Sequence, residues 1–215
     1  MYAETRPGHL KLLLQTKAQK VKGEVGLINN LFSVGLEQLN LYKPQLSFAE
    51  VKAFIEKVEP AYHSRIILYS HYGLARQFDL GGIHTTWRSA DSFYAKLWLN
   101  FTLGGKQVPL STTISSIASI ADCSENINEI LLGPVFVNSG NNIINMSYRR
   151  EIFERGIKRS NKNVIVMGGV CEKNIPYLKT LDVKGILLRR TIWDSMDPVS
   201  AFIKLRDFNY NPIAA

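Results

Sequence analysis

The sequence has little cysteine and no apolar run long enough to cross a bilayer. Its two cysteines, Cys123 and Cys171, cannot build a disulfide framework and form no CxxC pair, so a reducing, cytoplasmic setting is expected and a cysteine-based zinc site is not. The most apolar stretches, Ile66–Ser70 and Ile130–Val137, are strand-sized, far short of the ~20 residues that a span needs. The first residues lack the order of a signal peptide. No membrane partner is therefore expected.

Acidic residues are also scarce. The chain carries 18 Asp plus Glu against 26 Lys plus Arg, a formal net charge of +8. This surplus indicates an anionic partner, but its sign cannot distinguish nucleic acid from a small phosphorylated metabolite. The basic segment 148–162 has few aromatics and no nucleic-acid-binding motif, so we interpret it as a solvated outer helix and expect no nucleic-acid partner. No linker or repeat divides the chain, which predicts one domain over residues 1–215.

What the sequence does contain is an alternation of short apolar runs with amphipathic segments. Most of the runs are continuously apolar, which is typical of parallel strands covered on both faces. Eight such units favour an α/β fold, a single (β/α)8 TIM barrel, over an open sheet, for which a GxGxxG turn after the first strand is missing. The predicted strands are Lys11–Gln15, Gln38–Tyr42, Arg65–Ser70, Gly82–His84, Val108–Thr113, Ile130–Phe136, Asn163–Met167 and Gly185–Arg189.

The segments between these strands have helical spacing. Ser47 and Glu50 predict a capping box before one helix, and Asp197 followed by proline predicts the start of another. Asp91–Leu103 fits a helix, but its second half could equally be extended, and we leave it open. The other predicted helical segments are Val25–Phe32, Tyr148–Lys158 and Ile175–Leu181.

The ligand site of such a barrel lies at the carboxyl ends of its strands. The residues that end the seventh and eighth strands are of types that bind phosphate. Paired glycines after the seventh strand let the backbone approach a phosphate closely, and a basic pair after the eighth suits an anion. Either feature alone could be a turn or solvated arginines. At adjacent strand ends they together predict phosphate binding by Gly168, Gly169, Arg189, Arg190 and Thr191.

Other strand ends supply further polar candidates. A lysine at the second strand end, Lys43, can pair with a phosphate oxygen or simply lie on the surface. His71 and His84 show no metal-ligand spacing, and a structural hydrogen bond is the commoner role of such a histidine. The loop after the sixth strand could line a site or merely turn the chain. The remaining candidates at these ends are Asn40, Tyr42, Asn138 and Ser139.

Taken together, these strand ends resemble the thiamine phosphate synthase family and its thiazole tautomerase relatives. The likeness spans nearly the whole chain and is greatest to a short bacterial branch with an LHLRKP motif at the second strand. It implies a (β/α)8 barrel and a transferase that joins a thiazole phosphate to hydroxymethylpyrimidine pyrophosphate in thiamine biosynthesis, releasing pyrophosphate. The partner would be a small phosphorylated heterocycle. The matching segments are Leu39–Pro44, Gly82–His84, Leu132–Phe136, Met167–Val170 and Ile192–Trp193.

The resemblance also implies residue roles. Carboxylates would hold Mg²⁺, which neutralises the leaving pyrophosphate, but Ser70 and Ser89 stand where they are expected and Asp91 is the nearest substitute. Lys43 and His71 are the candidates for a catalytic role. The residues carried over to pyrophosphate or substrate binding are Asn40, Tyr42, Lys43, Arg88, Asn138 and Ser139.

Three functions stay open at this point. The first, which we favour, is the transferase. The second is a non-catalytic or altered-function barrel that keeps the phosphate site and has lost the metal carboxylates. The third is a tautomerase-like isomerase, in which Ile114 stands near the expected histidine, so that His71 or Cys171 would have to transfer the proton. Barrels of this size often self-associate, so a homo-oligomer is also considered.

Overall fold

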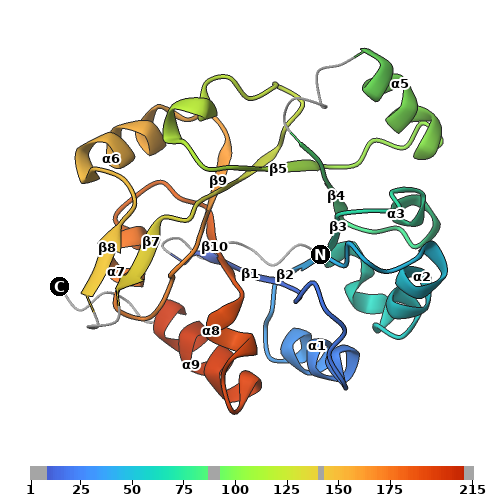
Figure 1. Ribbon diagram of the computed structural model, residues 1–215, viewed down its shortest axis with the longest axis horizontal. Coiled ribbons are helices and arrows are strands. Elements are labelled where there is room, and N and C mark those ends of the chain that lie inside the picture. Colours follow the sequence, from blue (N-terminus) through green and yellow to red (C-terminus); the bar gives the residue numbers. More distant parts are fainter. Residues whose placement is uncertain (1–8, 87–92, 140–142, 211–215) are drawn as a thin grey trace.

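The computed structural model describes residues 9–86, 93–139 and 143–210, and its central feature is a closed barrel of eight parallel strands. The strands follow the order β1-β10-β9-β6-β5-β4-β3-β2 around the barrel, which confirms the predicted (β/α)8 fold (Figure 1). Their bounds are β1 Lys11–Gln15, β2 Gln38–Leu41, β3 Ile66–Leu68, β4 Gly82–His84, β5 Leu110–Ile114, β6 Glu129–Leu132, β9 Asn163–Met167 and β10 Gly185–Leu188.

Helices surround the barrel (Figure 1). The predicted capping box is present at Ser47, whose side chain accepts from the Glu50 backbone while the Glu50 carboxylate accepts from the Ser47 backbone. Within the segment left open in the sequence, Phe93–Thr102 is helical, as α5. The helices are α1 Glu24–Ser33, α2 Phe48–Glu56, α3 Gly73–Gln77, α5 Phe93–Thr102, α6 Arg150–Arg159, α7 Ile175–Lys179, α8 Arg190–Trp193 and α9 Pro198–Tyr210, with 3-10 turns at Pro60–Arg65 and Ile117–Ile120. None of the described helices is long and apolar enough to span a membrane.

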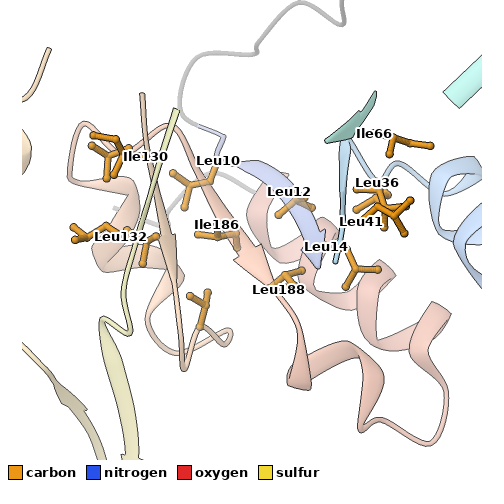
Figure 2. Close-up of a cluster of buried hydrophobic side chains, with 14 of the residues drawn as sticks. Leu10, Leu12, Leu14, Leu36, Leu41, Ile66, Ile130, Leu132, Ile186 and Leu188 are labelled. Carbon is orange, nitrogen blue, oxygen red and sulfur yellow. The ribbon is translucent and has the colours of Figure 1, made fainter. Parts of the chain in front are cut away.

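The strands are apolar on both faces because each face has its own core. In β1, Leu12 and Leu14 join the large cluster between strands and helices, part of which Figure 2 shows. Leu13, between them, points to the opposite face and packs inside the barrel. The inner cluster consists of Leu13, Leu131, Ile165 and Leu187, with Tyr69 and Met167 packed against it. This closed inner layer confines any ligand to the ends of the barrel.

The first and last parts of the chain close the barrel. Leu13 of β1 lies opposite Leu187 of β10 on one side and Gln38 of β2 on the other. Asn209, near the end of α9, is fully buried, and its side-chain amide donates to the Leu10 carbonyl at 2.7 Å and accepts from the Leu10 N–H at 3.2 Å. The last helix is thereby fixed to the start of the first strand.

The prediction was wrong after the sixth barrel strand. A strand over Ile130–Phe136 was expected, but β6 ends at Leu132, and the chain then forms an antiparallel hairpin of β7 (Phe136–Ser139) and β8 (Ile143–Met146). The hairpin is fixed by backbone pairing with the barrel loops, since the Phe136 N–H donates to the Gly168 carbonyl. Figure 1 shows it outside the ring of barrel strands. Asn138 and Ser139, taken for part of a loop, therefore lie on a strand.

Candidate functional site

An aromatic pair lies at the carboxyl end of the barrel. Tyr69 follows β3 and His84 ends β4, and their rings stack with centroids 4.0 Å apart and planes 11° from parallel. Asn40, fully buried inside the barrel, donates from its amide to the Tyr69 hydroxyl at 3.0 Å. The Tyr42 ring meets Tyr69 edge-on at 5.4 Å. The structure thus brings the predicted residues Asn40 and Tyr42 together with His84, and makes Asn40 a support for Tyr69.

His84 is electrically neutral at physiological pH. Its ring nitrogens lie 2.9 Å from the Ser111 hydroxyl and 3.2 Å from the Thr113 hydroxyl. Burial lowers the pKa of His84 to about 4, because a charged imidazolium would lose its hydration there. Burial likewise raises the pKa of the Tyr69 hydroxyl, so it stays a phenol. The stacked pair is therefore an uncharged surface whose polar atoms are hydrogen-bonded to Asn40, Ser111 and Thr113.

A cavity of about 560 Å³ opens beside this pair. Among the described residues, the lining side chains are uncharged, and most carry a hydroxyl group. Tyr72 forms part of the wall and donates from its hydroxyl to the His84 carbonyl at 2.7 Å. The lining residues are Tyr69, Tyr72, His84, Thr85, Thr86, Thr112 and Thr113. A cavity of this kind suits a planar, uncharged group.

The loops after β9 and β10 meet, as the predicted phosphate site requires. The Thr191 hydroxyl donates to the Val170 carbonyl at 3.1 Å, which joins the two loops. Gly168 and Gly169 have φ values of +86° and +64°, in the region that favours glycine. A Cβ at Gly169 would lie 2.3 Å from the Phe136 carbonyl oxygen, so the hairpin also requires glycine here. Close backbone packing is thus one established role of the glycine pair.

The arginines that follow β10 are exposed. Neither Arg189 nor Arg190 takes part in an ion pair within the part of the chain that the structure describes. Guanidinium groups without a carboxylate partner remain available to an anion. Phosphate binding at this end of the barrel stays a prediction, and the geometry is compatible with it.

Lys43 is not displayed at the surface. Its ammonium lies 2.8 and 2.6 Å from the two carboxylate oxygens of Glu24, and it also donates to the Gln19 carbonyl. The two side chains are only 1% and 4% exposed. Burial raises the pKa of Glu24, against the opposing effect of Lys43. Lys43 therefore compensates a buried carboxylate, and contact with pyrophosphate, which stays a prediction, would require this pair to separate.

His71, the other candidate for a catalytic role, lies apart from the cavity. Its Nε2 is 2.9 Å from the Leu46 carbonyl oxygen, and its ring meets the edge of Phe48. It is not among the residues that line the cavity beside Tyr69. The structure therefore gives His71 a packing and hydrogen-bonding role, and its catalytic role stays a prediction.

Arg88 and Asp91 lie outside the described residues, as do the side chains of Asn138 and Ser139 on β7. Among the residues that are described, no three His, Cys, Asp or Glu side chains gather as metal ligands. Mg²⁺ prefers carboxylate and water oxygens, whereas the end of β3 offers Ser70. The described residues do not fit the implied Mg²⁺, and we derive no step through it.

Sequence reasoning missed several residues of this site. Tyr69 comes directly at a predicted strand end, so its position was a usable signal, but its stacking on His84 was not visible. Thr113 was placed in a strand without a role. No sequence signal pairs Glu24 with Lys43, since 19 residues separate them.

Comparisons with known proteins bear on this geometry. No family model and no curated protein matches the chain. Solved structures do match. Thiamine phosphate pyrophosphorylase from Bacteroides thetaiotaomicron is 21% identical with a TM-score of 0.75, covering 93% of this chain and 97% of that one. The enzyme of the same name from Pyrococcus furiosus is 14% identical with a TM-score of 0.72, covering 93% and 95%.

These matches establish the fold. A 3-hexulose-6-phosphate synthase also matches, at 12% identity and a TM-score of 0.65, covering 93% of this chain and 99% of its own. The same barrel therefore occurs in proteins named for different reactions, and fold likeness alone does not choose among them. The first two structures, both named thiamine phosphate pyrophosphorylase, agree with the resemblance seen in the sequence.

Proposed function

We propose that the protein binds a small phosphorylated heterocycle at the mouth of the barrel, with its ring against Tyr69 and His84. Its phosphate would lie on the backbone of Gly168 and Gly169 and be held by Arg189, Arg190 and Thr191. The observation that carries this proposal is the combination, among the described residues, of a cavity with aromatic and hydroxyl side chains and two exposed arginines without an ion-pair partner, all at the carboxyl ends of the barrel strands. Thiamine phosphate is the compound named by two of the matching structures.

Each part of the site would do a separate task. A guanidinium can bind two phosphate oxygens at once, which fixes the orientation of the ligand. The flat Tyr69–His84 pair would stack on the ring, an arrangement worth about 0.5–1.5 kcal/mol beyond area burial. Both ring nitrogens of neutral His84 lie within hydrogen-bond distance of the Ser111 and Thr113 hydroxyls, which would hold the ring in place for stacking without adding a charge.

Thermal-shift measurements test this proposal. We expect thiamine phosphate and thiazole phosphate to raise the melting temperature to the same extent with Mg²⁺ and with EDTA. Arg190→Ala should remove most of the shift, whereas Arg159→Ala, which deletes an equal charge from the end of α6, should leave it unchanged. No shift, or an equal loss in both variants, would overturn the proposal.

The transferase reaction is the second candidate, and a specific observation favours it. Both thiamine phosphate pyrophosphorylase structures match over 93% of this chain. Purified protein would be incubated with thiazole phosphate, hydroxymethylpyrimidine pyrophosphate and Mg²⁺, and thiamine phosphate measured. Absence of product would leave binding as the function. The third candidate, the isomerase, needs a group that transfers a proton, and Ile114 does not supply one. Ile114 is 4% exposed and packs in the outer core.

A further inference from the structure

The backbone carbonyls of the loop after β9 are occupied by donors of the protein itself. Each successive carbonyl from Met167 to Cys171 accepts a hydrogen bond. In the order of those carbonyls, the donors are the Val135 N–H, the Phe136 N–H, the Asn174 side-chain amide, the Thr191 hydroxyl and the Asn174 N–H. Among the described residues, by contrast, the N–H groups of Gly168 and Gly169 meet no acceptor. The loop therefore offers donors rather than acceptors, which suits an anion.

One buried side chain, that of Asn174, bridges two residues of this loop. Asn174 is 5% exposed, its Nδ2 donates to the Gly169 carbonyl at 3.0 Å, and its Oδ1 accepts from the Cys171 N–H at 3.0 Å. An asparagine directly before a helix commonly caps that helix, but Asn174 makes no side-chain cap hydrogen bond to α7. Its side chain is thus committed to the loop and not to the helix that follows.

A loop built on glycine needs such a bridge, because glycine lets its peptide groups turn over easily. The C=O and N–H of a trans peptide point in opposite directions, so turning over the Gly169–Val170 peptide would exchange the places of its carbonyl and its N–H. A carbonyl oxygen brought toward a phosphate would repel it. The bond from Asn174 to the Gly169 carbonyl opposes this rotation, and the bond from the Cys171 N–H holds the next peptide.

We propose that Asn174 is a positioning residue for phosphate binding. It holds the loop after β9 with the glycine N–H groups available and the carbonyls turned to protein donors, and it does not touch the ligand itself. The inference rests on the proposed function for the place of the phosphate. It adds that the affinity contributed by the phosphate group depends on a buried side chain that orders the loop before the ligand arrives.

Thiamine phosphate and thiamine test this inference, because they differ only in the phosphate group. The ratio of their dissociation constants, measured by isothermal titration calorimetry, isolates the affinity that the phosphate contributes. Asn174→Ala should lower this ratio about tenfold, the size of one hydrogen bond to a charged group. Asn174→Asp keeps the acceptor for the Cys171 N–H but offers no donor to the Gly169 carbonyl, so its ratio should fall at least as far.

Asn209 supplies the matched control, since its side chain also donates to one backbone carbonyl and accepts from one backbone N–H, both of Leu10. Asn209→Ala should lower the melting temperature at least as much as Asn174→Ala and leave the ratio unchanged. The titrations are made at a temperature where circular dichroism shows each variant to be folded, and if Asn174→Ala does not fold, Asn174→Asp decides by the same criterion. A ratio within twofold of the wild type, or an equal fall in Asn209→Ala, would overturn the inference.

Inorganic phosphate separates failure of this inference from failure of the proposed function. Its titration into isotope-labelled protein should shift the NMR amide signals of Gly168 and Gly169 in the wild type, and much less in Asn174→Ala. If thiamine phosphate does not bind while this contrast persists, the proposed heterocycle site fails and the role of Asn174 stands. If thiamine phosphate binds through Arg190 but neither the ratio nor the amide shifts depend on Asn174, the inference alone fails. If neither compound binds, both fail.

Discussion

Lys43 lies at a strand end, where a ligand-binding role was predicted, but in the structure it forms a buried ion pair with Glu24. Its ammonium and the Glu24 carboxylate lie together in the core, where each would be costly alone. A buried ion pair is weak evidence of net stability, but removing one partner leaves an uncompensated charge. The pair therefore predicts a sharp contrast between single and double substitutions.

Lys43→Met should lower the free energy of unfolding by about 3–5 kcal/mol, because Glu24 would be left buried without a counter-charge. The double variant Lys43→Met with Glu24→Leu should recover most of that loss. Urea denaturation followed by circular dichroism measures both. If the single variant were as stable as the wild type, Lys43 would be free for a ligand and the structural role would be wrong.

His84 predicts a pH dependence of stability. Its pKa is lowered by burial to about 4, whereas an exposed histidine titrates near 6.5. Between these pH values the unfolded chain binds a proton at His84 that the folded chain does not. The contribution of neutral His84 to the free energy of unfolding is therefore complete above about pH 6.5 and is lost as the pH falls toward 4. Denaturation at pH 7.5, 6 and 5 should show this loss in the wild type. A His84→Gln variant with an unchanged slope would contradict the assignment.

Among the elements, glycine has opposite roles in α1 and in the loop after β9. Gly26 lies in the exposed part of α1 with open space around the position of a Cβ. Gly169 has a φ of +64° and the Phe136 carbonyl 2.3 Å from that position. The same substitution at the two sites should therefore change stability in opposite directions.

Gly26→Ala should raise the free energy of unfolding by about 0.5–1 kcal/mol, since alanine is the better helix former. Gly169→Ala should lower it by more than about 1–2 kcal/mol, the cost of the left-handed backbone alone, because the hairpin must also shift. Urea titration of the two variants side by side checks both signs. A neutral Gly169→Ala would mean that the hairpin does not rest on this loop.

The barrel elements were predictable because their signals are local. Continuous apolar runs placed β1, β4 and β9 at their observed bounds, and Ser47 with Glu50 placed the start of α2. The β7–β8 hairpin was missed, since its pairing with the Gly168 loop is a tertiary contact. The residues of the candidate site likewise include some that local sequence signals indicate and some that they do not. Strand-end positions indicated the loops after β9 and β10, where phosphate binding stays a prediction. Stacking of Tyr69 on His84 and pairing of Lys43 with Glu24 depend on closure of the barrel and have no local signal.

The whole molecule is held closed at one seam, where the two ends of the fold meet. Asn209 satisfies both backbone groups of Leu10, and the Trp193 indole donates to the Gln15 carbonyl at 2.7 Å. Both contacts join the last helices to β1. Closure of the barrel thus depends on a few polar contacts in addition to the pairing of β1 with β10.

Asn209→Ala should lower the free energy of unfolding by about 1–3 kcal/mol for each backbone group of Leu10 left buried and unpaired. Hydrogen exchange should accelerate together in β1, β10 and α9, while β5 and β6 keep their protection. Asn209→Asp retains only the acceptor, so its free energy of unfolding should lie between those of Asn209→Ala and the wild type. Uniform acceleration across all strands would show that the seam does not open by itself.

The register Leu13↔Leu187 also has a consequence for synthesis of the chain. The first strand leaves the ribosome early, but its partner β10 follows more than 170 residues later. At roughly 5–20 residues per second, β1 waits about nine to thirty-five seconds with one hydrogen-bonding edge open. An unpaired apolar strand is a template for wrong association. The nascent chain should therefore need protection by chaperones until its last strand appears.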